Sequence, residues 1–396
     1  MDVRNTLKLL AFSGLLLLCG CYRSKRNLTE NTAIVHMAFN PKGFHPTNDM
    51  DAGRGHVYDY TQRALFKIDL RANKHVPLLI KAVPKPDSTG TLYYMQLRND
   101  VKWDDGSPLT IDDVIFSAKL AMHPLTANPG LKGVFLSVIK SIQPCAGDSG
   151  CFFMKAHQPH NGNLEVFTEL YMLQKKWWDP EGLLDSCSFE DIYSNTYSPS
   201  GKLKKWFEKY NSRDNAFIVK QLVGLGPYKI TEWLADSHIT LVKKKNWWGD
   251  KDTVLFNRNE PDKIIFKIIK EDAAVYLALK NGKIDATNKI STTRLLKLRK
   301  QKFFNENYNW KMVNQYAYTY IGLNMKPNGN SQLPFFTDKR VRRAMAHLVP
   351  VEDLIKVFSK GQADRQVTNV SPLKRECNSL LKPIAFSVEK ATALLD

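Results

Sequence analysis

One stretch, residues 97 to 119, constrains the fold of this chain more than any other part of the sequence. It reads LRNDVKWDDGSPLTIDDVIFSAK. Leu97, Val101 and Lys102-Trp103 fit a strand with alternating side chains, and the Asp-Gly pair that follows favours a tight turn. Thr110 and Asp113 match a capping box, in which the hydroxyl and the carboxylate each satisfy a backbone N–H group at a helix start. The stretch predicts a strand, a turn and a helix in direct succession, with Trp103 in the core.

Strand-like and helix-like patterns alternate along the rest of the chain. The expected strands are 33–35, 239–242, 264–269 and 284–286, which are short apolar runs. Further helices are expected from Glu271 to Gly282, from Thr337 to near Pro350, and after Ser387. The last two helices are predicted to bury Val341, Ala344, Met345, Leu348, Val388, Ala391, Leu394 and Leu395. The pattern predicts a mixed α/β protein, and 396 residues suffice for two or three domains.

The chain is strongly basic, with 57 Lys and Arg residues against 39 Asp and Glu residues and a net charge of +18. Basic residues are spread along the chain beside acidic ones, and the sequence has no nucleic-acid recognition motif. We therefore interpret the charge as a solvated basic surface suited to anionic lipid. Nucleophile elbows, phosphate-binding loops, HExxH helices and EF-hand loops are also absent from the sequence. The sequence favours neither a nucleic-acid-binding protein nor an enzyme, and it indicates no cofactor.

The N-terminus has the pattern of an exported protein. Two basic residues precede a mainly apolar stretch, 9–18, which as a helix would rise only about 15 Å and is too short to cross a bilayer. Leu18, Gly20 and Cys21 resemble a bacterial lipobox. Residues 1–20 are therefore predicted to be a signal peptide, and Cys21 the lipidated residue of a periplasmic, membrane-anchored cell-envelope lipoprotein. A secreted protein without the lipid is the alternative.

Four cysteines remain beyond the lipobox, at positions 145, 151, 187 and 377. In an oxidising compartment, a disulfide between Cys145 and Cys151 can close the short glycine-containing loop between them. Free buried thiols are the alternative for this pair.

Metal binding has weaker support in the sequence. No Cys-x-x-Cys pair is present, so a structural zinc site is not indicated. His157 and His160 lie near Cys151, but Pro159 between the histidines disfavours a helix and no third ligand is evident. Solvent-exposed loop histidines are the simpler interpretation, and no metal site is predicted.

An ordered series of motifs resembles the bacterial extracellular solute-binding proteins of family 5, which include oligopeptide, dipeptide and nickel receptors. The series comprises the stretch 97–119, GLGPYKITEW at 224–233, KKNWWG at 244–249, PDKIIFKIIKEDAAVYLALKNGKIDA at 261–286, YIGLN at 320–324 and FFTDKRVRRAMAHLV at 335–349. The resemblance extends from about Ala33 to Asp396. Pro350 departs from the family pattern, which commonly has an aspartate there.

The resemblance implies an α/β, two-lobed periplasmic-binding-protein fold of type II with an extra domain, in which the lobes close on a peptide and deliver it to ABC transporter permease subunits. A peptide would pair its backbone with strand edges, while roomy hydrated pockets accept its side chains. The implied division is a tether at 21–31, a first lobe at 32–80 and 222–285, an extra domain at 81–221, and a partial second lobe at 286–396.

The resemblance also suggests a few ligand-contacting residues. Gly224 and Gly226 allow a close backbone approach, with Tyr228 beside them, and a turn between strands is the alternative. Tyr320 and Asn324 would lie on one face of a strand near the ligand, with core packing and turn capping as alternatives. In the pairs Trp177-Trp178 and Trp247-Trp248, adjacent strand residues point to opposite sides, so at most one of each pair could stack on a ligand, and core packing is favoured.

Family members continue well beyond the last helix expected here, so we expect an incomplete second lobe. The missing part includes the tryptophan-rich strand and the aspartate that holds the peptide ammonium group in oligopeptide receptors, so no residue here inherits that role. A second polypeptide chain could supply the rest. The alternatives are a scaffold-only surface lipoprotein without autonomous ligand binding and a metal-chelate receptor of the nickel type.

Overall fold

The computed structural model describes residues 30–48, 50–69, 71–72, 74–212, 222–313, 318–326, 334–374 and 377–396. The predicted signal peptide, Cys21 and most of the predicted tether lie outside these ranges. The chain divides into two compact units, Met1–Glu271 with Gly282–Asn288, and Asp272–Asn281 with Lys289–Asp396. Within the described ranges, no helix has the length and apolar character that a membrane span requires.

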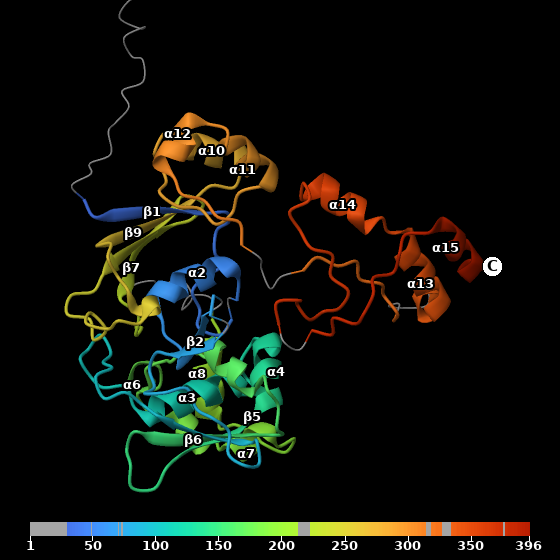
Figure 1. The fold of residues 1–396 in the computed structure, drawn as a ribbon. Coiled ribbons are helices and arrows are strands. Elements are labelled where there is room, and N and C mark those ends of the chain that lie inside the picture. Colours follow the sequence, from blue (N-terminus) through green and yellow to red (C-terminus); the bar gives the residue numbers. More distant parts are fainter. Residues whose placement is uncertain are drawn as a thin grey trace, which may run out of the picture. The chain divides into compact units, whose positions relative to one another are not determined.

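The first unit contains a four-stranded sheet in the order β1-β9-β8-β7. Its strands are β1 (Thr32–Met37), β7 (Tyr228–Leu234), β8 (His238–Lys243) and β9 (Lys263–Ile268). β1 and β9 are parallel and the other pairs are antiparallel. Helix α2 (Ala52–Thr61) lies against one face of this sheet (Figure 1), where alternate residues of β9 join its core. The strands expected at 33–35, 239–242 and 264–269 are confirmed, whereas the one expected at 284–286 forms only a single bridge from Ala286 to Val35.

The part of the first unit around residues 81–212 forms its own layers. A sheet in the order β4-β6-β5 is accompanied by six α-helices and two short 3-10 helices, η1 (Asn163–Glu165) and η2 (Leu183–Ser186), and the hairpin β2-β3 precedes them (Figure 1). The elements are β2 (Phe66–Asp69), β3 (Lys74–Pro77), β4 (Leu92–Gln96), α3 (Ile111–Met122), α4 (Pro129–Val138), β5 (Ile139–Pro144), β6 (Cys151–Ala156), α5 (Val166–Glu169), α6 (Lys175–Trp178), α7 (Phe189–Tyr193) and α8 (Gly201–Tyr210). A disulfide joins Cys145 to Cys151 across the β5-β6 turn, and Cys187 is a free, buried thiol.

Helix α3 begins as the sequence predicts. Asp113 accepts from the Thr110 backbone N–H at 2.9 Å, the Thr110 hydroxyl accepts from the Asp113 N–H, and Trp103 is buried with its indole N–H 3.2 Å from the Asp113 carboxylate. The strand expected before it is wrong, because β4 ends at Gln96. The chain from Trp103 instead folds into a turn in which the Trp103 N–H donates to the Ser107 carbonyl at 2.8 Å.

The regular elements of the second unit in the described residues are helices, including the short 3-10 helix η5 (Phe335–Thr337). The α-helices are α10 (Asp272–Lys280), α11 (Thr292–Leu298), α12 (Lys302–Asn307), α13 (Lys339–Leu348), α14 (Val351–Phe358) and α15 (Val388–Leu395). Helix α10 contacts the residues that follow it: the Tyr308 hydroxyl donates to the Leu279 carbonyl at 2.9 Å, and Arg294 pairs with Asp272 at 3.1 Å.

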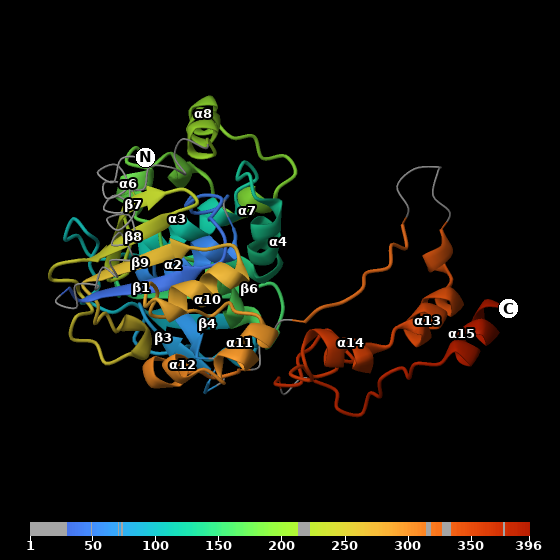
Figure 2. The ribbon, with the colours of Figure 1, turned by 90° about the horizontal axis from the view of Figure 1, so that it is seen from above.

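Three predicted helices of this unit are confirmed as α10, α13 and α15, with Gly282 in the left-handed conformation just beyond α10. The predicted burial is wrong for α13 and α15, which lie side by side (Figure 2) and bury only Ala344 and Ala391. Four residues expected in the core are exposed instead, and they are Met345, Leu348, Val388 and Leu395. The described residues place no further layer over these side chains.

Loss of the Cys145–Cys151 disulfide should lower the free energy of unfolding by about 2 kcal/mol, because the crosslink restricts the unfolded chain. We expect the Cys145→Ser/Cys151→Ser variant to shift the urea unfolding curve of the full chain by this amount. A reducing agent should lower the stability of the unmodified protein to the same level and leave the variant unchanged. Coincident curves for the two proteins without reductant would contradict the expectation.

Candidate functional site

The glycines at 224 and 226 allow the chain to touch the end of helix α2. A Cβ atom at Gly224 would lie 2.1 Å from the Thr61 carbonyl oxygen, and one at Gly226 would lie 2.3 Å from the Tyr60 carbonyl oxygen. The Gly226 N–H donates to the Thr61 carbonyl at 3.0 Å. This backbone-to-backbone packing explains both glycines without a ligand.

A pocket of about 370 Å³ lies beside this contact, entirely within the first unit. Three tyrosines line it together with charged residues of both signs, and the lining includes Asp59, Tyr60, Arg63, Lys67, Tyr171, Tyr228, Arg258 and Glu260. Burial raises the pKa of Tyr60 and of Tyr171, so both phenols stay protonated. A pocket of this size suits one amino-acid side chain or a small solute and is too small for an extended peptide.

Tyr228 is the one predicted site residue that lines this pocket. Its ring is buried, and its hydroxyl donates to the Pro261 carbonyl at 2.6 Å. Its ring meets that of Tyr60 edge-on at 5.9 Å. Burial raises the pKa of Tyr228 strongly. Tyr228 therefore contributes a fixed aromatic wall, and its hydroxyl is already occupied.

Arg63 forms another part of the wall, and its guanidinium group is buried. It donates to the Asn257 side-chain oxygen at 2.9 Å and to the carbonyls of Asp59, Gln62 and Phe256 at 2.8, 2.8 and 3.0 Å. All four acceptors are uncharged. Burial consequently lowers its pKa to about 10, although the group stays protonated at neutral pH. Arg63 ties the end of α2 to the short helix η4 (Leu255–Asn257).

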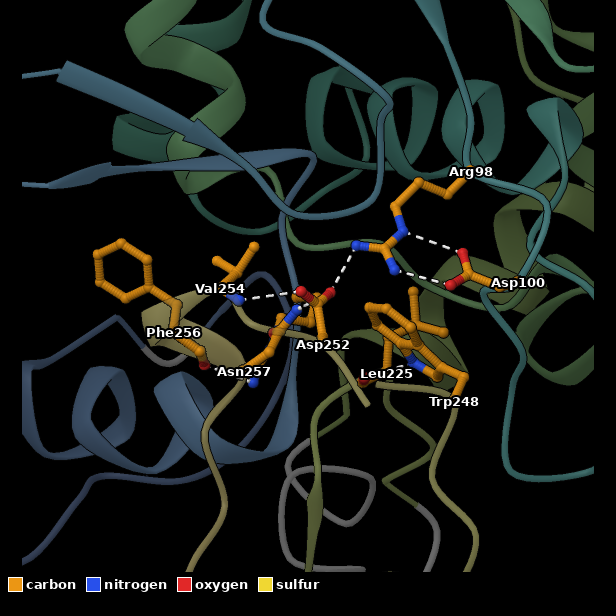
Figure 3. A network of polar contacts seen from close by, with 9 residues as sticks. Arg98, Asp100, Leu225, Trp248, Asp252, Val254, Phe256 and Asn257 are labelled. Atoms are coloured by element: carbon orange, nitrogen blue, oxygen red, sulfur yellow. Dashed lines mark hydrogen bonds and ion pairs between the residues drawn. The ribbon is translucent and has the colours of Figure 1, made fainter. Parts of the chain in front are cut away.

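A network of polar contacts continues from Asn257 into the neighbouring layers (Figure 3). The Asp252 carboxylate accepts from Arg98 at 2.6 Å, from the Asn257 amide at 3.1 Å and from the Val254 N–H at 3.0 Å. Arg98 also holds Asp100 through two hydrogen bonds. Burial opposes ionisation of Asp252, but these donors outweigh it and hold the pKa of the carboxyl below its ordinary value.

The tryptophans of the KKNWWG motif have a structural role that the sequence analysis missed. Both indole N–H groups, of Trp247 and Trp248, donate to the Leu225 carbonyl, at 2.9 and 3.0 Å. The two residues lie in a turn rather than on a strand, directly after Asn246, which has a φ of 53°. The expectation that their side chains point to opposite sides of a strand is therefore wrong. Core packing holds for Trp247, which is buried. In the other pair, Trp177 and Trp178 belong to helix α6 rather than a strand.

Lys244 of the same motif completes the contact with the glycine-containing segment. Its ammonium group donates to the Gly224 carbonyl at 2.6 Å and pairs with Asp104 at 2.6 Å. Burial lowers its pKa, while the Asp104 charge opposes that effect. The KKNWWG motif thus fixes the GLGPY segment and joins it to the stretch 97–119.

Tyr320 and Asn324 do not lie on a strand, so the placement of these two residues on a strand is wrong. They belong to a segment of the second unit without regular structure, where no strand pairs with it in the described ranges. Tyr320 is 75% exposed. Asn324 accepts from the Lys326 N–H at 3.0 Å, which is the turn-capping alternative. The first unit holds Gly224, Gly226 and Tyr228, so the five predicted ligand residues do not form one cluster within either unit.

The histidines near Cys151 do not form a metal centre. His157 packs edge-on against Tyr193 at 5.0 Å, and the His160 ring nitrogen accepts from the Gly162 N–H at 3.0 Å. In the part of the chain that the structure describes, no three His, Cys, Asp or Glu side chains come together in a way that could hold a metal ion.

Comparisons with known proteins place these features in context. The family model of the bacterial extracellular solute-binding proteins, family 5 Middle, matches residues 74–396. The probable peptide-binding protein YejA of Agrobacterium fabrum is 23% identical over 289 residues, covering 73% of this chain and 42% of that protein. The dipeptide-binding protein DppE of Bacillus subtilis is 25% identical over 287 residues, covering 71% and 45%. The chain thus spans a little less than half the length of these relatives.

Solved structures share the fold. DppA of Helicobacter pylori in complex with the peptide STSA aligns with a TM-score of 0.66 at 21% identity, over 92% of this chain and 65% of that one. AppA of Bacillus subtilis in complex with a nonapeptide aligns with a TM-score of 0.67 at 21% identity, over 92% and 63%. NikZ of Campylobacter jejuni in complex with Ni(L-His) aligns with a TM-score of 0.66 at 21% identity, over 92% and 62%. The α/β periplasmic-binding-protein fold predicted from the sequence is confirmed.

The variant Asp252→Ala should lower the free energy of unfolding by about 2 kcal/mol, because Asn257 loses an acceptor and Arg98 loses the less exposed of its two carboxylate partners. The Asp252 side chain is 7% exposed, whereas the Asp100 side chain is 57% exposed, and both carboxylates accept hydrogen bonds from Arg98. The matched variant Asp100→Ala should therefore cost less than about 1 kcal/mol. Urea unfolding at pH 7 measures both, and equal losses would contradict the ranking.

Acid should remove the contribution of Asp252. Because its pKa in the folded protein lies below the ordinary value of about 3.9, its stabilisation is complete above that pH and is lost as the pH falls through the lower folded pKa. The stability difference between the unmodified protein and Asp252→Ala should consequently shrink below about pH 4. A difference that stays constant down to pH 2 would contradict this.

Proposed function

This chain belongs to the bacterial extracellular solute-binding proteins of family 5, and from that premise we propose that it captures peptides for an ABC importer. The support is the match of the family model over residues 74–396, together with relatives described as peptide-binding proteins. The family consists of solute-binding transport proteins rather than enzymes. Each sequence relative is roughly twice as long as the matched part, so peptide capture by this chain is a proposal.

The proposed mechanism is closure of the two units on a peptide. The chain passes between the units three times, after Glu271, after Asn281 and after Asn288, which provides a multi-stranded connection of the kind that bends as a hinge. Closure would remove the peptide from water, and contacts to its backbone would not depend on its sequence. The pocket lined by Tyr228 is our candidate for holding one side chain of that peptide.

A metal chelate is the second candidate ligand, because NikZ in complex with Ni(L-His) aligns as well as the peptide complexes do. The peptide is favoured because more of the similar proteins are described as peptide-binding, among them YejA, DppE and AppA. A chelate could also be held by a protein that provides few direct ligands to the metal.

We further propose that Cys21 carries a lipid that anchors the folded units at the cell envelope, where permease subunits would receive the peptide. The support is the order of a basic start, an apolar stretch and a lipobox-like end in the sequence. Several acyl chains, at about 0.8 kcal/mol for each buried methylene, would retain a protein of this size at a membrane.

Native mass spectrometry of the full chain tests the ligand. If the chain captures peptides from the cell, gentle ionisation should give a series of masses above the unmodified one, and mild denaturation should release a mixture of short peptides. Added Ni(L-His) should then give no further mass shift. A folded protein that shows no bound peptide and no shift with added peptide mixtures would overturn the proposal, and a shift with Ni(L-His) alone would favour the second candidate.

Metabolic labelling with a fatty acid tests the anchor. Label should enter the unmodified protein in bacterial cells and be lost in Cys21→Ser, because the acyl chains are attached through this residue. The neighbouring Cys19→Ser variant is the matched control and should retain the label. Equal labelling of both variants, or label in neither protein, would contradict the assignment of Cys21.

A further inference from the structure

Strand β1 lies between the two segments of the first unit that lead into the second unit. We call each point at which the chain changes unit a passage: the first follows Glu271, the second Asn281 and the third Asn288. On one side β1 pairs with β9, which ends three residues before the first passage. On the other side it pairs with the segment that precedes the third passage, after Asn288. There the Asp285 N–H donates to the Ile34 carbonyl at 2.7 Å and the His36 N–H donates to the Ala286 carbonyl at 2.8 Å.

The side chain of His36 links both segments at once. It is 2% exposed, and its two ring nitrogens have partners on opposite sides of β1. Nε2 lies 2.9 Å from the carbonyl oxygen of Ile269, two residues before the first passage. Nδ1 lies 2.7 Å from the hydroxyl oxygen of Thr287, one residue before the third passage.

These two partners determine which ring nitrogen carries the proton when the imidazole is neutral. The Ile269 carbonyl can only accept, so Nε2 carries the proton and donates to it. Nδ1 then accepts from the Thr287 hydroxyl. An apolar side chain of the same volume could make neither contact. The ring is therefore more than core packing, because it joins two backbone segments that are 18 residues apart in the sequence (269 and 287).

We propose that His36 is a positioning residue that anchors the hinge of this protein. It fixes the first-unit ends of the first and third passages to one strand, so that bending during closure is confined to the few residues beyond Ile269 and Thr287. The proposal rests on the proposed closure around a ligand. Without the anchor, the two segments would move independently of β1, and closure would no longer start from one defined geometry.

Hydrogen exchange on the full chain without ligand tests the anchor directly. The variant His36→Phe keeps a ring but loses both nitrogens, and it should accelerate exchange at 269–272 and at 285–289 by about five- to tenfold. Thr287→Val keeps the side-chain shape and removes one contact, so it should accelerate only 285–289. Unchanged exchange at both segments in His36→Phe, or equal acceleration of both in Thr287→Val, would overturn the proposal.

A matched variant separates the anchor from general destabilisation of the sheet. His238 lies on β8 of the same sheet, 27% exposed, and its ring contacts Glu232 rather than a passage. His238→Phe should leave exchange at 269–272 and 285–289 unchanged. If it accelerates exchange there as much as His36→Phe does, the anchor role is overturned.

Peptide affinity then connects the anchor to closure. In the unmodified protein, binding of the mixed peptides released from it should be measurable, and His36→Phe should weaken it by about three- to tenfold. Unchanged affinity with accelerated exchange would overturn the role of His36 in closure. If the unmodified protein binds no peptide while exchange responds as expected, the proposed ligand fails and the anchoring of the two segments stands.

Discussion

The buried carboxylate of Asp252 is the interaction on which the organisation of the first unit depends. It joins Arg98, beyond strand β4, to Asn257, and through Asn257 to the buried guanidinium of Arg63 at the end of helix α2. Two of these contacts, Arg98 to Asp252 and Arg63 to Asn257, each join residues more than 150 positions apart in the sequence. Because the Asp252 side chain is 7% exposed and its carboxylate accepts from both Arg98 and Asn257, moving either segment away would leave this charge with fewer donors.

Three of the motifs that carry the family resemblance, the stretch 97–119, GLGPYKITEW and KKNWWG, meet within the first unit, and their contacts are structural. Trp247, Trp248 and Lys244 all bond carbonyl groups of the GLGPY segment, and Lys244 reaches Asp104 in the stretch 97–119. These contacts stabilise one unit, and none of the three side chains is free for a ligand. The resemblance is therefore strong where the fold is specified, which explains why it identifies the family more clearly than it identifies ligand contacts.

The sequence predicted those features whose cause is local. Thr110 and Asp113 cap α3 across three residues, and Gly282 follows α10 because a left-handed residue terminates a helix. It failed where the outcome depends on distant partners: the YIGLN segment has strand-like residues, but a strand also needs a neighbour to accept its hydrogen bonds. The direction of Trp248 likewise depends on the conformation of Asn246 and on a carbonyl 23 residues away. The role of His36 was invisible because its partners lie more than 230 residues away.

The proposed closure needs parts that differ in stiffness, and the contacts within the first unit would supply the stiff part. Within the first unit, the hydrogen bonds to the Asp252 carboxylate and those from Trp247 and Trp248 to the Leu225 carbonyl restrict the movement of one layer against another. The passages consist only of short connecting segments. A ligand shifts a two-state equilibrium only by its difference in affinity for the two states, so binding energy lost in deforming a soft unit would not contribute to closure. In the proposed role, His36 holds the segments beside β1 in place, so that bending is limited to the residues at which the chain passes from one unit to the other. A buried histidine serves this purpose well because one ring can bind a carbonyl on one side and a hydroxyl on the other.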